Sequence, residues 1–268
     1  MPIPDYLIKN RQRIEDLPIQ DLGTWNASYD NEAFDEFKII RTLREQFPSK
    51  IIRRADIVNL FRNNQKYLGF VSSMVWGFIN ASRPRIKGGD RKTTNLYRAL
   101  SHEQNKVEDA MKFAEEKFEK SDYRSPFEIM MSGKKYKIPG VDYRYYTKIF
   151  FFLGQAKDSI ATKPLIFDKW TTNAFYALLS QSHPDDVQKY FRGVKDGNPG
   201  EAVVRSGKKL IHAYERFIKE MNQWAKEIDV SPDKLEQFVF GHDLRKEYIN
   251  TNPRIELWEI ISDNRQLV

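Results

Sequence analysis

Apolar residues recur at steps of three and four positions over much of the chain, which is the spacing of one face of an α-helix. The most regular stripe contains Val204, Ile211, Tyr214, Phe217, Ile218, Met221, Trp224 and Ile228. Two shorter stripes contain Phe34, Phe37, Ile40, Leu43 and Phe47, and Ile57, Leu60 and Phe61. A further stripe, which predicts one long helix, contains Leu96, Leu100, Val107, Met111, Ala114 and Phe118. These patterns predict an all-α fold.

Alternation of apolar and polar residues, the pattern of a strand, is rare in this chain. The best examples are KKYKI (134–138) and KPLIF (163–167), and each is short enough to be an extended linker. The segment VSPDKLEQFVF instead predicts a short helix, with Ser231 as its N-cap and Pro232 in its first position.

The first thirty residues differ in composition from the rest of the chain. They contain three prolines and the polar segment NASYD, which predicts an N-terminal arm over residues 1–30 that lies on the domain. No convincing boundary follows, so we expect one helical domain over residues 31–268.

The composition is that of a soluble globular protein. The chain has 268 residues, 40% hydrophobic and 13% aromatic, which is enough for a full core. No window approaches the roughly 18 apolar residues of a membrane helix. Because the N-terminal segment also lacks a secretory apolar core, we expect a cytoplasmic protein without a membrane partner. We also expect a monomer.

The sequence lacks the residues and motifs of most cofactor and metal sites. It has no cysteine, which excludes disulfides, a thiol nucleophile and thiolate-held zinc or iron–sulfur clusters. Its four histidines show no metal-binding spacing, and the glycine motifs of phosphate loops and dinucleotide sites are missing. We therefore expect no cofactor and no metal. The net charge of +7 suits a polyanionic partner such as nucleic acid, although many basic proteins lack one.

The stretch IPGVDYRYYTKIFFFLGQ (138–155) combines a turn with an apolar helix. The pair Pro139–Gly140 breaks any helix and predicts a tight turn whose backbone N–H groups can point outward. A helix then begins near Asp142, whose carboxylate suits an N-cap, and it ends at or before Gly154. This helix carries Lys148 at the head of an aromatic and aliphatic run.

The next stretch, KPLIFDKWTTNAFYALL, places Asp168 at the start of another helix. The two helices are consecutive and joined by a short linker, so Lys148 and Asp168 can face one cleft. A lysine among apolar walls loses hydration of its ammonium, which favours the neutral amine. Such an amine can form a Schiff base, and a neighbouring carboxylate can accept a proton or stabilise a cationic transition state.

Both residues also have a purely structural interpretation. Lys148 can lay its stem on the aromatic rings and keep its ammonium in water. Asp168 can serve only as a helix cap.

The stretch from Ile138 to Leu179 resembles the helix–hairpin–helix DNA glycosylase superfamily, in particular the bacterial 8-oxoguanine glycosylase fold. In that family a hairpin of the type L-P-G-V-G precedes a helix with a catalytic lysine, and an aspartate opens the next helix. Here IPGVD occupies the hairpin position, Lys148 that of the lysine, and LIFD supplies Asp168.

The sequence departs from this family pattern in the hairpin. Asp142 replaces the usual second glycine, and the spacing from Gly140 to Lys148 is longer than usual, so the hairpin carries an insertion or has another register. This departure bears on the predicted phosphate contact of the hairpin more than on the predicted roles of Lys148 and Asp168. The absence of cysteine excludes the iron–sulfur cluster of the endonuclease III branch, so the 8-oxoguanine branch fits better.

The resemblance implies a DNA glycosylase with lyase activity at abasic (AP) sites, acting on double-stranded DNA with a modified base flipped out of the stack. Lys148 would be the nucleophile at the sugar C1′ and form the Schiff base. Asp168 would stabilise the oxocarbenium-like transition state and assist proton transfers. The backbone N–H groups of Gly140 and Val141 would hold a phosphate of the damaged strand.

Further contacts with DNA are suggested by residues near the lysine and by one loop. Tyr145, Phe151 and Phe152 can line the base pocket, although each fits the core as well. The loop GFINASRPRIKGGDRK (77–92) contains basic residues that can contact phosphates, and a polar residue that can fill the gap left by a flipped base. These are Arg83, Arg85, Lys87 and Arg91, and Asn80. An ordinary solvated loop explains the same residues.

Three functions stay open at this stage. The first is a glycosylase whose substrate is 8-oxoguanine, the family default, or a modified phage base, because relatives of this shorter bacterial type occur beside antiviral defence genes. The second is a non-catalytic DNA-binding module or antiviral-defence accessory protein that retains the glycosylase scaffold. The third is an unrelated helical protein.

Overall fold

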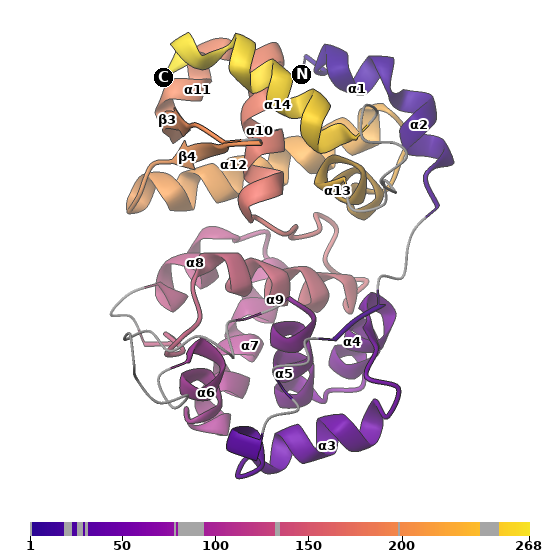
Figure 1. Cartoon of the computed structure of the whole chain (residues 1–268), viewed down its shortest axis with the longest axis vertical. Coiled ribbons are helices and arrows are strands. Elements are labelled where there is room, and N and C mark those ends of the chain that lie inside the picture. The colour runs from indigo at the N-terminus through magenta and orange to yellow at the C-terminus, as the bar shows by residue number, and fades with distance from the viewer. Residues whose placement is uncertain are drawn as a thin grey trace. The chain divides into compact units, whose positions relative to one another are not determined.

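The computed structural model describes most of the chain residue by residue. The described residues are 2–18, 23–25, 29, 32–77, 79, 94–131, 135–197, 199–241 and 252–268. By their internal contacts these residues form two compact units, whose helices and strands are labelled in Figure 1. The central unit is Gln20–Pro164, and the discontinuous unit joins Met1–Ile19 to Leu165–Val268.

The central unit is organised around two apolar helices, α5 and α9. Its elements in chain order are β1 (Gly23–Thr24), the 3₁₀ helix η2 (Glu32–Phe34), α3 (Lys38–Gln46), β2 (Ile52–Arg53), α4 (Arg54–Arg62), α5 (Lys66–Trp76), α6 (Asn95–Leu100), α7 (Gln104–Phe118), α8 (Arg124–Met130) and α9 (Tyr143–Gln155). Helix α5 contacts α3, α4, α7 and α9, and α9 contacts α4, α7 and α8 as well. Strands β1 and β2 pair antiparallel, with Thr24 opposite Ile52.

The apolar sequences of α5 and α9 explain why these two helices form the core. Every residue of α5 from Tyr67 to Trp76 is buried. On α9 the run from Ile149 to Gly154 is buried, and so are Tyr146 and Thr147. Lys148 interrupts this buried surface and is itself half-buried.

The discontinuous unit contains both ends of the chain. Its elements are α1 (Asp5–Lys9), α2 (Arg11–Asp16), α10 (Lys169–Ser182), α11 (Pro184–Tyr190), β3 (Phe191–Lys195), β4 (Glu201–Val204), α12 (Lys208–Glu227), α13 (Pro232–Phe240), α14 (Pro253–Asp263) and the 3₁₀ helix η5 (Arg265–Leu267). Helix α10 lies at its centre, in contact with α1, α11, α13, α14 and β4. Strands β3 and β4 pair antiparallel, with an irregularity between Phe191 and Gly193.

The N-terminal segment forms two short helices that are fixed to this unit. The N–H of Tyr6 donates to the side chain of Gln181 on α10 at 3.0 Å, and its hydroxyl donates to Glu256 on α14 at 2.5 Å. Figure 1 shows the indigo α1 and α2 beside the yellow α14. The division into an arm over residues 1–30 and a domain over 31–268 stays a prediction.

The predicted all-α fold is confirmed, because only two small two-stranded sheets accompany the helices of the described residues. One predicted helix is divided: the stripe from Leu96 to Phe118 belongs to α6 and α7, with a break after Leu100. The hydroxyl of Ser101 donates to the carbonyl of Tyr97 at 2.9 Å, a local hydrogen bond of the kind that competes with helix continuation.

The strands lie elsewhere than the alternating segments suggested. Among the described residues, 135–138 and 163–167 are extended or turn segments that belong to no sheet. The hairpin β3–β4 spans residues 191–204 and overlaps the stretch 193–209, whose glycines and lysines are typical of a connection. Its strands are too short for a clear alternation, so only the pairing of the two reveals them.

Candidate active site

The turn before α9 is fixed by a tyrosine of that helix. The hydroxyl of Tyr146 accepts a hydrogen bond from the N–H of Ile138 at 2.7 Å and donates to its carbonyl at 3.4 Å. The N–H of Val141 donates to the same carbonyl at 3.2 Å and closes the turn. Burial raises the pKa of Tyr146, so its hydroxyl stays protonated and keeps both hydrogen bonds at neutral pH.

Gly140 is required by the conformation of this turn. Its φ angle is +84°, and a Cβ at this position would lie 2.2 Å from the carbonyl oxygen of Asn95. Because Asn95 is the first residue of α6, the turn packs directly on the start of that helix. A residue with a side chain would be both strained and in collision.

Helix α9 begins directly after the turn. The side chain of Asp142 accepts a hydrogen bond from the N–H of Arg144 at 2.9 Å and so provides the predicted N-cap. Since the helix starts at Tyr143, the long spacing between Gly140 and Lys148 consists of helix. Lys148 lies in the second turn of α9, and an insertion or another register of the hairpin stays a prediction.

The stem of Lys148 lies against the C-terminal end of α5. A Cβ on Gly77 would come within 2.7 Å of Cδ and 3.3 Å of Cε of Lys148. Gly77 itself ends α5, where its N–H donates to the carbonyl of Ser73 at 2.9 Å. The Nζ atom of Lys148 lies 5.6 Å from the ring centroid of Tyr145, a cation–π distance. The missing side chain of Gly77 thus leaves space for the stem of Lys148, and the ammonium of Lys148 lies over the ring of Tyr145.

The helix end that supports Lys148 is held by the segment around β1. The hydroxyl of Tyr29 donates to the carbonyl of Met74 at 3.2 Å, and the hydroxyl of Thr24 donates to that of Trp76 at 2.9 Å. Tyr29 is fully buried, and burial raises its pKa, so it remains a donor. These hydrogen bonds fix the surface on which the lysine stem lies.

Aromatic rings and a second cation surround the helix that carries the lysine. The rings of Trp76 and Phe152 meet edge to face with their centroids 5.2 Å apart. The guanidinium of Arg54, a residue that is 9% exposed, lies 5.2 Å from the Trp76 ring and 5.1 Å from the Phe151 ring. Phe151 and Phe152 are buried and belong to the core, which leaves Tyr145 as the half-buried aromatic residue beside Lys148.

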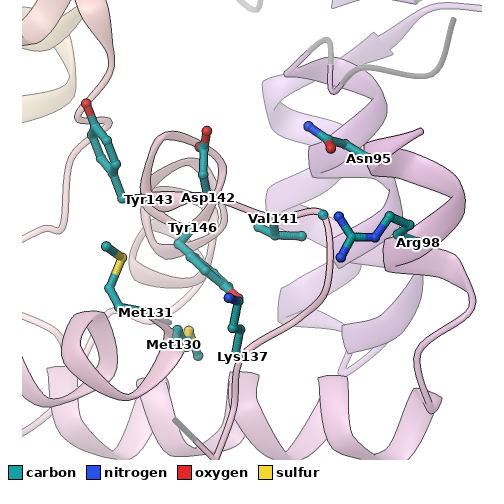
Figure 2. A pocket seen from close by; sticks show the side chains of 10 residues that line it. Asn95, Arg98, Met130, Met131, Lys137, Val141, Asp142, Tyr143 and Tyr146 are labelled. Atoms are coloured by element: carbon teal, nitrogen blue, oxygen red, sulfur yellow. The ribbon is translucent and has the colours of Figure 1, made fainter. Parts of the chain in front are cut away.

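A cleft of about 350 Å³ opens beside the turn. It is lined by Asn95, Arg98, Met130, Met131, Lys137, Gly140, Val141, Asp142, Tyr143 and Tyr146. Figure 2 shows Arg98 extending from α6 toward the turn, with Asp142 and Tyr143 at the start of α9. The lining carries two positive charges, from Arg98 and Lys137, against one carboxylate, and the N-terminal end of α9 adds partial positive charge. The cleft therefore suits an anion.

Asp168 lies at the N-terminus of α10 in the discontinuous unit. Its Oδ1 accepts hydrogen bonds from the N–H groups of Trp170 at 3.0 Å and Thr171 at 3.4 Å. The hydroxyl of Thr171 accepts one from the N–H of Asp168 at 2.9 Å, which completes a capping box. Asp168 is 9% exposed, and these hydrogen bonds hold its carboxylate in one orientation.

Arg254, in the first turn of α14, interacts with this carboxylate. Its guanidinium lies 4.2 Å from the ring of Trp170 and 4.6 Å from the ring of Phe240, and its Nε donates to the carbonyl of Phe240. Burial lowers the pKa of Arg254, and the negative charge of Asp168 acts in the opposite direction.

The structure assigns the predicted site residues to both units. Gly140, Val141 and Lys148 belong to the central unit, and Asp168 belongs to the discontinuous unit. The predicted DNA contacts of the basic loop, Asn80, Arg83, Arg85, Lys87 and Arg91, lie outside the described residues.

Four residues of these surroundings are not predicted from the sequence: Gly77, Arg98, Tyr146 and Arg254. Gly77 and Arg254 act on residues distant in the chain. Arg98 lines a cleft beside a turn that is distant in the chain, and Tyr146 acts across the turn that precedes its own helix. Only Gly77 has a local signal, because it directly follows an apolar helix and glycine is frequent at helix ends.

The described part of the chain offers neither a membrane-spanning helix nor a cluster of metal-binding side chains. No helix there is both long and apolar enough to span a bilayer. No group of three or more histidine or acidic side chains is placed there to hold a metal ion.

A helical protein in which a glycine turn leads into a lysine-bearing helix, and an aspartate caps the next helix, has the elements expected of a base-excision enzyme. The family model described as "Putative 8-oxoguanine DNA glycosylase OGG-like protein" matches residues 20–240. The chain therefore belongs to this family, and membership supports a DNA glycosylase kind of function and binding to DNA. No curated protein and no solved structure in the comparison matches it.

Proposed function

We propose that this protein is a DNA N-glycosylase with AP-lyase activity, in which Lys148 is the nucleophile and Asp168 the stabilising carboxylate. The observation that carries the proposal is the placement of Lys148, whose stem crosses Gly77 and whose ammonium lies on Tyr145 one helix turn after a glycine turn. A lysine that only reached water would need neither the gap left by this glycine nor the fixed helix end beneath it.

The reaction begins with a nucleotide flipped out of the duplex, since C1′ cannot be reached within the stack. After its ammonium has given one proton to water, Lys148 donates its lone pair to C1′ while the bond to the base breaks, and the base leaves with the bonding electrons and takes a proton from water. The carboxylate of Asp168 stabilises the positive charge that develops on the sugar and takes up the proton that the amine loses. Opening of the sugar ring gives the Schiff base, and loss of a proton from C2′ then expels the 3′-phosphate.

The proposed substrate is an oxidised purine of the 8-oxoguanine type. Membership in a family described as 8-oxoguanine DNA glycosylase-like supports this class. A modified phage base, in a role in antiviral defence, is the alternative within the same chemistry. A panel of duplexes that carry 8-oxoguanine opposite each base, and other modified bases, tests the proposal by base release. Tight DNA binding without release from any duplex would favour a non-catalytic binding module.

We further propose that the cleft beside the turn holds a backbone phosphate of the DNA. The amide of Val141 already closes the turn onto Ile138, so a phosphate would share it, whereas Arg98 and Lys137 supply full charges. Gly140 is the position at which the backbone itself can approach the phosphate closely.

Replacement of Arg98 by glutamine is expected to weaken binding to duplex DNA uniformly across sequences. Loss of one phosphate contact lowers the slope of log K against log salt concentration by about 0.9. The measurement is a salt titration of DNA affinity, with Lys137→Gln expected to behave in the same way. The matched control is Arg62→Gln, an exposed arginine on α4 that does not line the cleft. An unchanged slope for Arg98→Gln and Lys137→Gln would remove the cleft from the DNA interface.

Replacement of Gly77 by alanine is expected to displace Lys148 without removing a functional group. The added Cβ would lie 2.7 Å from Cδ of the lysine, so the stem must move. A displacement of about 1 Å lowers rates by about 10- to 100-fold, and we expect this loss in single-turnover base release with DNA affinity retained. Gly193→Ala is the control, because nothing lies within 4 Å of a Cβ there. Equal rates for both variants would show that the stem position is unimportant.

A further inference from the structure

We infer that Arg254 is a positioning residue for Asp168, whose carboxylate it holds through its own charge and through the indole ring of Trp170. The inference rests on the proposed function, because it assigns a task to a residue that packs on Trp170, whose N–H holds the proposed catalytic carboxylate. It also assigns a task to α14, a helix that lies beyond the residues 20–240 matched by the family model.

The guanidinium of Arg254 is confined on two sides by aromatic rings. It lies 4.2 Å from the Trp170 ring and 4.6 Å from the Phe240 ring. Its Nε donates to the carbonyl of Phe240, and a Cβ on Gly241 would come within 2.8 Å of its Cγ. Both the aliphatic part and the guanidinium of Arg254 are therefore fixed, unlike those of an arginine on an open surface.

Arg254 and Asp168 meet at the same tryptophan. The backbone N–H of Trp170 donates to Oδ1 of Asp168 at 3.0 Å, while the ring of Trp170 carries the guanidinium. The two charges also interact directly, since the charge of Asp168 counteracts the effect of burial on Arg254. The positive charge of Arg254 therefore lies on the ring of the residue whose N–H holds the carboxylate, and it complements the negative charge that the proposed mechanism assigns to Asp168.

The lysine next to Asp168 has two contacts of its own in the described structure. The Nζ of Lys169 lies 4.7 Å from the Trp170 ring and donates to the carbonyl of Pro199 at 3.3 Å. Lys169 and Arg254 thus both lie on Trp170. Lys169 therefore serves as a matched control, a cation on the same ring that is directed toward the loop before β4.

The test is a double-mutant cycle between Arg254→Gln and Asp168→Asn, measured as the single-turnover rate of base release at saturating duplex DNA. The duplex carries whichever modified base the wild-type protein releases. Arg254→Gln alone is expected to lower this rate between about 3- and 10-fold, the effect of one half-buried charge. In the Asp168→Asn background the same substitution is expected to change the rate by less than about twofold, because coupled residues are not additive.

Two further variants separate positioning from folding. Arg254→Lys keeps the charge and is expected to recover most of the rate, and Lys169→Gln is expected to leave the rate unchanged. Equal rates for Arg254→Lys and Arg254→Gln would show that only packing matters and would overturn the inference. An equal loss of rate in the wild-type and Asp168→Asn backgrounds would also overturn it. So would a weaker DNA affinity with an unchanged rate at saturation, because Arg254 would then be a phosphate contact.

A failure of the inference about Arg254 can be distinguished from a failure of the proposed glycosylase function. If the wild-type protein releases no base, the same cycle is measured on urea unfolding without DNA. Arg254→Gln is then expected to shift the unfolding midpoint more when Asp168 is present than when it is asparagine. An equal shift in both backgrounds would contradict the coupling between the two side chains, whatever the protein does to DNA.

Discussion

Replacing Lys148 by glutamine is expected to lower the rate of base release by at least about 10³-fold and to abolish strand cleavage, because no other group then forms the Schiff base. Glutamine keeps Cβ and Cγ of the stem and replaces the outer part, which lies on Gly77, and the amine by a shorter neutral carboxamide. Since Lys148 is half-buried at the edge of a fully buried helix face, the fold should persist. The measurement is single-turnover base release and strand cleavage on a duplex that the wild-type protein processes.

Lys163 provides the matched control for this substitution. It is a part-buried lysine of the same unit, whose Nζ donates to the carbonyls of Gly154 at 3.1 Å and Lys157 at 2.8 Å. Lys163→Gln removes an amine that the structure already uses, so stability should fall while the activity of the folded protein persists. If Lys148→Gln released base and cleaved DNA like the wild type, Lys148 would not be the nucleophile.

Replacing Asp168 by asparagine is expected to lower base release by about 10²- to 10³-fold with little effect on stability. Asparagine ranks with aspartate as an N-cap, so the hydrogen bonds from the N–H groups of Trp170 and Thr171 can be kept. What is lost is the negative charge that stabilises the cationic transition state. DNA affinity should stay the same or rise, because one negative charge is removed.

Asp168→Ala separates the two tasks of this residue. It loses both the charge and the cap, which is expected to cost about 1 kcal/mol of unfolding free energy in addition to the loss of rate. The measurements are urea unfolding and single-turnover rates of both variants. If Asp168→Asn kept the wild-type rate while Asp168→Ala only unfolded more easily, Asp168 would be a helix cap and nothing more.

The features that could be predicted from the sequence are those with a local cause. Asp142 and Asp168 each precede an apolar helical run, and both prove to be N-caps through hydrogen bonds to the following residues. The stripes likewise predict most helices, because each needs only the period of its own side chains.

The parts that could not be predicted depend on residues that meet only in the folded chain. The position of Lys148 is set by Gly77, which precedes it by many residues and acts by lacking a side chain. Arg254 reaches Trp170 from the last long helix, so nothing near either residue in the sequence indicates the contact. The hairpin β3–β4 was missed for a similar reason, since its strands are recognisable only as a pair.

The most direct test of the central claim is borohydride trapping on duplex DNA, followed by mapping of the covalent adduct by peptide mass spectrometry. The account predicts one adduct per DNA strand, located on Lys148, in the wild-type protein and in Lys163→Gln, and no adduct in Lys148→Gln. An adduct on another lysine such as Lys169, or no adduct with a duplex whose base is released, would contradict it.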